Sequence, residues 1–239
     1  MWPFGKKMTL EESGFFRGFI DWHSHILPGV DDGVQTMDES LQILAKYEHL
    51  GIAEVWLTPH IMEDMPNKTE YLQKCFSELK RNYNGNIKLH LASENMMDTL
   101  FVNRLKEDDL LPLGSGQRYL LVETSYFEPP MNLYDILSNI KKKGYIPVLA
   151  HPERYGYMEK PYYRQLKNMG VEFQLNLLSL GGIYGQRVQK KAEWLLKEDL
   201  YKISGTDIHN YKICRDFLVN TNLTTRNFYL LQTLGTQSI

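Results

Sequence analysis

The chain has 239 residues, of which 43% are hydrophobic and 23% are charged, and its formal net charge is −2. This composition is typical of a globular protein, and the length suffices for one large core or one α/β barrel. The slightly acidic balance argues against a general nucleic-acid-binding protein, because such proteins need a basic surface.

No long apolar run follows Lys6 and Lys7, and none reaches the length of a membrane span. We therefore expect neither a signal peptide nor a transmembrane helix. The two cysteines, Cys75 and Cys214, do not make a disulfide framework, so a reducing cytoplasm is the expected compartment.

Segments of strand and helix character alternate along the chain. An apolar run leads into a first strand that ends at 21–25, and further strands are predicted at 53–58, 87–92, 119–122, 146–150, 171–175 and 200–204. Helices are predicted at 40–50, 67–83, 99–106, 133–143, 162–169, 186–198 and 210–234, the last with a break at 220–225. Thr36 and Glu39 have the spacing of a capping box before the first helix, and Gly51 ends it.

This alternation predicts parallel βα units. Seven or eight units in a chain of this length favour a closed barrel over an open sheet, so the predicted fold class is α/β barrel. No repeat, low-complexity tract or linker interrupts the pattern. We therefore expect residues 1–18 to form an N-terminal extension and residues 19–239 to form one domain.

Histidines and carboxylates gather at the carboxyl ends of the predicted strands, where a parallel barrel has its active-site face. His23 and His25 are one residue apart at the end of the first strand, so their side chains should point to the same side. Five of the seven histidines lie at such ends, which scattered surface histidines would not do. The candidate metal ligands are His23, His25, Asp32, His60, Glu94, Glu123, His151, Asp207 and His209.

This set exceeds the roughly four ligands that one ion needs, so we predict two or three divalent ions that share carboxylates. The set contains no thiol, and mixed imidazole and carboxylate ligands suit Mn²⁺, Fe or Zn²⁺. Clustered metals activate water and hold the attacking and leaving oxygens of a displacement at phosphorus. Arg154, three residues after His151, can offer a planar guanidinium to a phosphate, so the set favours hydrolysis of a phosphate ester.

Each of these residues also has a simpler interpretation. A single Asp or His at a strand end is often a helix cap. Asp31 or Asp32 can serve only to shape the turn before Gly33, and Asp31 has the weaker claim to be a ligand. Arg154 can form a surface ion pair with Glu153 or Glu159.

Other residues are assigned to structure rather than to chemistry. His49 and His90 lie within predicted elements and are assigned to packing or solvent. Lys212 and Arg215 are assigned to a solvated helix face, with a second phosphate contact as the alternative. Residues 75–81 have the Cys-x5-Arg spacing of thiol phosphatases, but they lack a glycine-rich loop and lie within a predicted helix, so Cys75 is taken as structural.

The motifs of strand ends together resemble a known family. Asp21-x-His23-x-His25, residues 30–33, residues 150–155 (AHPERY) and residues 207–210 (DIHN) resemble the polymerase-and-histidinol-phosphatase (PHP) superfamily. Within it, the chain is similar to the bacterial capsule and exopolysaccharide tyrosine-protein phosphatases of the CpsB/YwqE type. The resemblance runs from about residue 18 to residue 210. One departure is residues 95–97 (NMM) after Glu94, where many relatives have an aromatic residue.

The resemblance implies a distorted, TIM-like (β/α)7 barrel with a trinuclear centre that is often manganese-dependent. It implies the nine ligands given above, with Glu123 as a bridging carboxylate and Arg154 as the phosphate-binding arginine. Arg154, Asp207 and His209 are the predicted catalytic residues. The implied substrate is phosphotyrosine, typically on a polysaccharide-synthesis tyrosine kinase.

The mechanistic hypothesis is attack on phosphorus by a metal-activated hydroxide without a covalent phosphoenzyme. The tyrosyl phenolate, with a pKa of about 10, is a fair leaving group. One alternative is a small-molecule phosphatase of the histidinol-phosphate type, and another is a metal-dependent nuclease, against which the acidic balance counts. An alternative of another class is a non-catalytic, metal-containing binding module.

Overall fold

The computed structural model describes residues 8–235 and 239, and strands and helices alternate along them. The strands are β1 Met8–Thr9, β2 Ile20–Ser24, β3 Glu54–Leu57, β4 His60–Ile61, β5 Lys88–Leu91, β6 Glu94–Met96, β7 Tyr119–Glu123, β8 Ile146–Ala150, β9 Glu172–Asn176, β10 Ile203–Gly205 and β11 Asn222–Leu223. The helices are α1 Met37–Leu50, α2 Thr69–Asn82, α3 Thr99–Glu107, α4 Leu133–Lys142, α5 Lys160–Asn168, α6 Leu177–Leu180, α7 Gln186–Lys197, α8 Tyr211–Asn220 and α9 Thr225–Gly235, with a 3-10 turn at Pro152–Arg154.

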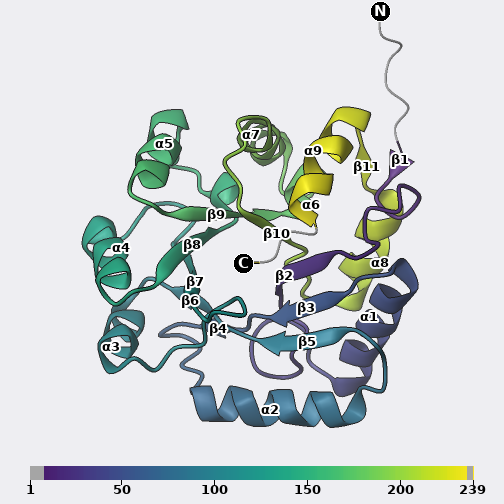
Figure 1. Cartoon of the computed structure of the whole chain (residues 1–239), viewed down its shortest axis with the longest axis horizontal. Coiled ribbons are helices and arrows are strands. Elements are labelled where there is room, and N and C mark those ends of the chain that lie inside the picture. The colour runs from purple at the N-terminus through teal and green to yellow at the C-terminus, as the bar shows by residue number, and fades with distance from the viewer. Residues whose placement is uncertain (1–7, 236–238) are drawn as a thin grey trace, which may run out of the picture.

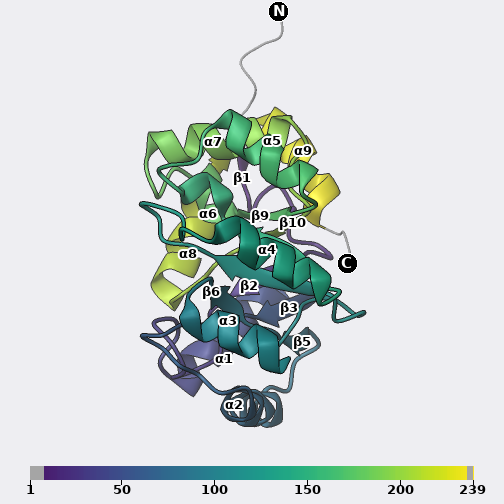
Figure 2. The same ribbon diagram turned by 90° about the vertical axis from the view of Figure 1, so that its left-hand side faces the viewer.

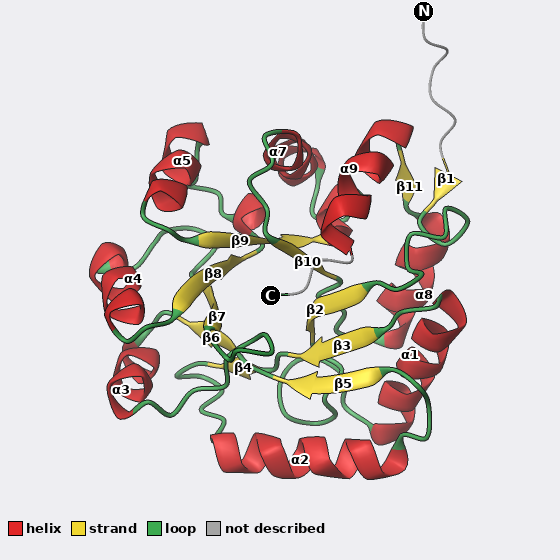
Figure 3. Cartoon of the chain, in the orientation of Figure 1, coloured by secondary structure: helices red, strands yellow, loops and turns green. Residues whose placement is uncertain are grey.

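Parallel strands curl around a central axis, and helices cover their outer side (Figure 1 and Figure 3). Six strands pair in the order β10-β9-β8-β7-β6-β4, and three pair in the order β2-β3-β5. The chain runs from β3 into β4 and from β5 into β6 across interruptions at 58–59 and 92–93, so the two sheets continue one another. The molecule is therefore an α/β fold with a curled parallel sheet.

Two backbone hydrogen bonds join the end of β2 to the segment after β10. The N–H of Asp207 donates to the carbonyl of His23 (2.8 Å), and the N–H of His25 donates to the carbonyl of Ile208 (3.0 Å). Pairing of β2 with β3 shifts its register between Asp21 and Ser24. Such irregularities re-aim side chains and are common beside functional sites.

Apolar side chains pack on both sides of the curled sheet. An inner cluster includes Trp22, Leu121 and Val148 from three strands, and the C-terminal Ile239 packs against it. In the view of Figure 1 the C-terminus projects into the middle of the ring of strands, and Figure 2 shows it toward one end of that ring. A larger cluster fills the space between strands and helices, and Figure 2 shows α3, α4 and α5 side by side on one flank. Burial of both clusters is the main stabilising term of the fold.

The described part of the N-terminal segment is packed onto the rest of the chain. β1 pairs with β11 in antiparallel fashion, and the side chains of Leu10, Phe15 and Phe16 are buried in the larger cluster. Residues 1–7 lie outside the described residues. Within residues 8–235, no helix is long and apolar enough to cross a membrane.

The predicted strands and helices are present, with small shifts at their ends. The Thr36 side chain caps α1 by accepting from the N–H of Glu39, and Gly51 ends the helix in a left-handed conformation (φ 85°). The Glu39 carboxylate does not close the capping box but accepts from the N–H of Tyr211. The seventh strand begins later than predicted, because the N–H of Leu200 still closes the turn after α7.

Four short strands and one short helix were not predicted: β1, β4, β6, β11 and α6. They span two to four residues, which is too short for a periodic signal. The break predicted at 220–225 is confirmed, and it contains β11.

Candidate metal centre

The two histidines of the opening motif converge on one point. His23 Nε2 and His25 Nε2 are 3.1 Å apart, as their one-residue spacing predicts. Their outer nitrogens are held by other side chains: His23 Nδ1 lies 3.0 Å from Gln174 Oε1, and His25 Nδ1 lies 2.7 Å from Asp31 Oδ2. Fixing the outer nitrogen orients the ring and leaves the inner nitrogen free to bind a metal.

Four groups of potential ligand atoms surround this point, and the atoms of each group lie within 4.8 Å of one another. The groups overlap because His23, His25, His60 and Glu94 each belong to two of them. The groups are His25, Asp32, His60 and His209; His23, His25 and Asp207; His23, Glu94 and His151; and His60, Glu94 and Glu123. All nine side chains predicted from the sequence therefore lie together, although they are up to 186 residues apart in sequence, from His23 to His209.

Unsatisfied buried atoms indicate that these groups fit metal ions. His60 Nδ1 and Glu123 Oε1 face each other at 3.0 Å, yet neither has a hydrogen-bond partner among the described residues. The other nitrogen of His60, Nε2, lies 3.6 Å from Asp32 Oδ1 and so faces a different group. Buried polar atoms without partners are costly, and a shared cation would satisfy them. Imidazole and carboxylate ligands without thiols suit hard or borderline divalent metals.

The histidines and carboxylates of the cluster face each other, and this attraction shifts their pKa values. Burial alone lowers the pKa of His23, but the facing carboxylates of Glu94 and Asp207 raise it to about 9. Burial alone raises the pKa values of Glu94 and Asp207, but the facing histidines hold both well below the usual range. These two carboxylates are therefore ionised, and a metal that binds would displace the proton of His23, because a neutral imidazole is the ligand.

Two of the proposed ligands have left-handed backbone conformations. His151 has φ 34° and Asp207 has φ 52°, and each follows directly or closely after a strand, β8 or β10. Non-glycine residues in this region carry strain of about 1–3 kcal/mol and are enriched at functional sites. These kinks turn both side chains into the centre at the point where the strands end.

Arg154 lies at the edge of the centre between aromatic rings. Its Nη1 donates to Asp207 Oδ2 (3.0 Å), and its guanidinium carbon lies 4.5 Å from the ring of Tyr126 and 4.2 Å from the ring of Tyr184. Burial alone lowers the pKa of Arg154, but the Asp207 carboxylate more than offsets this and raises it. The guanidinium is thus charged and held by ring stacking on its faces.

The alternative surface pairing of Arg154 is wrong. Glu153 is buried and accepts from the N–H of Asn176 and from the Tyr201 hydroxyl. Glu159 lies 3.3 Å from Arg187 instead. Arg154 pairs with a carboxylate of the centre because the 3-10 turn after His151 directs it inward.

A cavity of about 320 Å³ opens onto the centre. It is lined by six of the proposed ligands, by Arg154 and by the two tyrosines: Asp32, His60, Glu94, His151, Asp207, His209, Arg154, Tyr126 and Tyr184. Asp32 is the most exposed of the ligands, with 62% of its side chain accessible, and His209 is next at 25%. The volume is at the small end of the range for small-molecule sites, about 300–1,000 Å³.

Several residues of the site were not predicted from the sequence. Gln174 Oε1 accepts from the N–H of His151 (3.1 Å) in addition to facing His23, and Asn176 Nδ2 donates to Asp207 Oδ2 (2.6 Å). Gln174 and Asn176 alternate at the end of a strand, which is the signal that identified His23 and His25. Tyr126 and Tyr184 lie in loops, where no periodic signal marks them.

Residues assigned to structure lie apart from the centre. His90 stacks on Trp56 with ring centroids 4.5 Å apart and lies 3.0 Å from Glu54. Cys75 is half-buried within α2, as expected for a structural cysteine. Arg215 pairs with Asp216 at 3.0 Å on the exposed side of α8.

Known proteins resemble this chain over most of its length. The family model of capsular polysaccharide synthesis proteins, CpsB/CapC, matches residues 19–221. The tyrosine-protein phosphatase CpsB of Streptococcus agalactiae is 30% identical over 229 residues, covering 83% of this chain and 90% of that protein. The tyrosine-protein phosphatase YwqE of Bacillus subtilis is 29% identical over 221 residues, covering 90% of this chain and 82% of that protein.

The fold is also similar to a solved structure. Crystal structures of YwqE from Bacillus subtilis and CpsB from Streptococcus pneumoniae are described as those of unique metal-dependent tyrosine phosphatases. The match has a TM-score of 0.76 and 26% sequence identity, and it covers 91% of this chain and 88% of the other. The chain therefore belongs to the CpsB/CapC family of capsular polysaccharide synthesis proteins.

Proposed function

We propose that this chain is a metal-dependent tyrosine-protein phosphatase. The observation that carries the proposal is the convergence of nine imidazole and carboxylate side chains on one cavity beside a charged, aromatic-clamped Arg154. The names of the matching relatives support the same activity. Because the family model is one of capsular polysaccharide synthesis, we further propose a tyrosine kinase of capsule or exopolysaccharide synthesis as the substrate protein.

We assign the residues as follows. The nine side chains of the four groups hold two or three divalent ions, with Mn²⁺ as the proposed metal and Fe or Zn²⁺ as alternatives. Such ions, when bound, activate water and neutralise charge on the phosphoryl oxygens.

Arg154, Asp207 and His209 are the proposed catalytic residues. The guanidinium of Arg154 binds phosphoryl oxygens and stabilises the charge that builds on them in the transition state. Asp207 holds that guanidinium at 3.0 Å, and Asn176 fixes the same Asp207 oxygen. His209 lines the cavity together with Asp32 and is partly exposed, so we assign both to the side from which the phosphate enters.

The finer fold and the domain boundaries are also proposals. We propose that the two sheets form one distorted, TIM-like (β/α)7 barrel, supported by the continuity of β3 with β4 and of β5 with β6, and by the hydrogen bonds of His25 and Asp207. We propose residues 1–18 as an N-terminal extension and residues 19–239 as one domain. The cytoplasmic location stays a prediction.

Metal reconstitution followed by turnover tests the proposed function. Protein stripped with a chelator is reloaded with Mn²⁺, Fe²⁺ or Zn²⁺, its metal content is measured, and its turnover of a phosphotyrosine peptide is recorded. We expect His25→Ala to lose metal and activity together. We expect Arg154→Lys to keep its metal and to lower kcat/KM by about 10- to 100-fold, because a planar charged donor is lost.

Other outcomes would contradict the proposal. Full turnover by metal-loaded His25→Ala would exclude the centre as the site of catalysis. A higher kcat/KM on histidinol phosphate than on the peptide would favour the small-molecule phosphatase. Metal binding without turnover of either substrate would favour the non-catalytic binding module.

A further inference from the structure

The two loops whose tyrosines stack on Arg154 also carry large, exposed apolar side chains. Tyr126, in the loop between β7 and α4, is followed by Phe127, whose exposed fraction is 86%. Tyr184, in the loop between α6 and α7, is preceded by Ile183, whose exposed fraction is 52%. Each loop therefore places an aromatic wall in the cavity and an uncovered apolar residue beside it.

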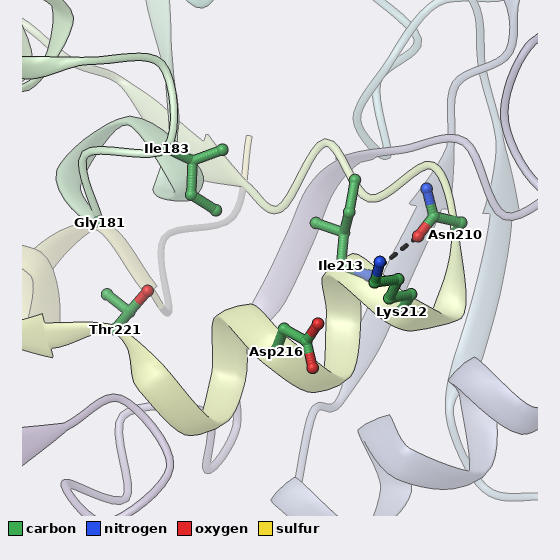
Figure 4. A pocket seen from close by; sticks show the side chains of 7 residues that line it. All are labelled: Gly181, Ile183, Asn210, Lys212, Ile213, Asp216 and Thr221. Carbon is green, nitrogen blue, oxygen red and sulfur yellow. Dashed lines mark hydrogen bonds between the residues drawn. The ribbon is translucent and has the colours of Figure 1, made fainter.

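A groove of about 540 Å³ adjoins the cavity on the side of Ile183. Figure 4 shows Ile183 on its loop and, across the groove, α8 carrying Lys212, Ile213 and Asp216. Ile213 lines both the groove and the metal cavity, so the two spaces are neighbours. The start of α8 is fixed, because the N–H of Ile213 donates to Asn210 Oδ1 (2.9 Å).

The two charged side chains that line this groove differ in whether they form an ion pair. Asp216 is paired with Arg215 at 3.0 Å. Lys212 is exposed and makes no ion pair with any residue within the described part of the chain. The groove therefore offers an apolar wall at Ile183 and Ile213 and one available cation, a combination that is complementary to an apolar residue beside an acidic one.

The cavity is too small to hold a protein substrate, so the adjoining groove could bind the residues that flank the phosphotyrosine. A space of about 320 Å³ accommodates an aryl phosphate side chain but not the polypeptide that carries it. The residues on either side of a phosphotyrosine must then lie over the edge of the cavity. We call this edge, which carries Phe127, Ile183, Lys212 and Ile213, the rim. Exposed apolar patches with polar edges mark interaction surfaces, and the rim carries Phe127 and Ile183 at such positions.

We propose that this rim binds the extended polypeptide that flanks the phosphotyrosine. An apolar side chain of the substrate packs between Ile183 and Ile213, an acidic side chain pairs with Lys212, and the opposite flank passes over Phe127. The proposal rests on the proposed phosphatase function and adds to it the substrate preference: phosphotyrosine in an unfolded segment with apolar and acidic neighbours.

Comparison of two substrates tests the proposal. Wild type, Ile183→Ser, Phe127→Ser and Lys212→Glu are assayed, metal-loaded, on phenyl phosphate and on a phosphotyrosine peptide with Leu and Asp neighbours. Tyr71→Ser is the matched control, because Tyr71 is 48% exposed but lies on α2. We expect kcat/KM on the peptide to fall about tenfold in each rim variant, mainly through KM, as the loss of one buried apolar side chain or one ion pair predicts.

Phenyl phosphate separates this proposal from the proposed function. Its kcat/KM should stay within about twofold of wild type in all four variants, since none of the four side chains lines the metal cavity. A peptide with Lys in place of Asp should be preferred by Lys212→Glu. Equal losses of kcat/KM on both substrates, or no loss on the peptide, would contradict the proposal that the rim binds the peptide. If wild type hydrolyses neither substrate, the proposed function itself is wrong.

Discussion

Asp31 contacts two of the nine proposed ligands without belonging to any of the four groups. Its Oδ2 lies 2.7 Å from His25 Nδ1 and accepts from the backbone N–H of His60 (3.0 Å). Burial alone raises the pKa of Asp31, but the facing His25 lowers it to about 2. Asp31 is therefore an ionised carboxylate that fixes the orientation of His25, which agrees with its weaker claim to be a ligand.

Replacing Asp31 should weaken metal binding without removing a ligand. We expect Asp31→Asn to lower metal affinity by about 10- to 100-fold, the usual effect of losing the carboxylate behind a ligating histidine. Competition with a chromophoric chelator measures the affinity. Asp38→Asn is the control, because Asp38 is exposed in the first turn of α1. An unchanged affinity in Asp31→Asn would show that His25 is oriented by its packing alone.

The cysteines should be dispensable for hydrolysis. Cys214 is fully buried, and burial raises the pKa of its thiol to about 12. Its thiolate, the reactive form, becomes abundant only as pH approaches that value, so Cys214 should resist a thiol reagent at pH 8 until the protein unfolds. Mass spectrometry after labelling measures this. We expect Cys75→Ser and Cys214→Ser to retain turnover. A loss of turnover in folded Cys75→Ser would instead support a catalytic thiol at Cys75.

At the scale of elements, the junction of β2 with β10 determines where His23 and Asp207 lie. Asp21 of β2 accepts from the N–H of Thr206 (2.8 Å) and from its hydroxyl (2.7 Å). The Tyr47 hydroxyl from α1 also donates to Asp21, at 3.1 Å. A Cβ on Gly205 would lie 2.6 Å from the backbone nitrogen of His23, so the close approach of the strands requires glycine. These contacts tie the two ends of the curled sheet together.

Thr206→Val should loosen this junction. The variant keeps the shape of the side chain but leaves the buried Asp21 carboxylate with one donor fewer, so we expect a loss of about 1–3 kcal/mol in the free energy of unfolding. Urea denaturation at fixed metal concentration measures the change. Thr206→Ser restores the hydroxyl and should recover most of the stability. If Val and Ser variants unfold alike, the hydroxyl does not stabilise the junction.

At the scale of the whole molecule, the metal centre links the two parallel sheets. Its side chains come from β2, β4, β6 and β7 and from the loops that follow β2, β8 and β10, and His60 and Glu94 are the first residues of β4 and β6. The carboxylates among them repel one another at close range, and histidine protons or metal ions offset this repulsion. The stability of the fold should therefore depend on the bound metal.

Chelation should destabilise the protein and abolish activity reversibly. A ligand that binds only the folded state stabilises it by about 2.7 kcal/mol at a free concentration 100 times its Kd. We expect the Tm to fall in excess chelator and to rise with the logarithm of added metal. Glu94→Gln, which alters two of the groups, should show a smaller dependence. A wild-type Tm that is indifferent to metal would contradict the assignment of the centre.

The sequence by itself determined the order of seven strands and of every described α-helix except α6, and it determined the nine candidate ligands. Strand periodicity and the position of His60, Glu123 and His151 at strand ends were enough, because all parallel strands of one sheet end on the same side. Gln174 and Asn176 were open to the same reasoning, since they alternate at the end of β9.

Tertiary structure decided which loop residues join the centre and how the ligands are oriented. The clamp of Tyr126 and Tyr184 on Arg154, and the pairing of Arg154 with Asp207, connect loops 28 to 53 residues apart. No local pattern encodes these contacts, because loop side chains lack a period and their partners depend on how the helices pack around the sheet. The residues at the ends of strands can be predicted from short-range alternation in the sequence. The loop residues around the cavity are brought together by long-range packing, which the sequence pattern does not show.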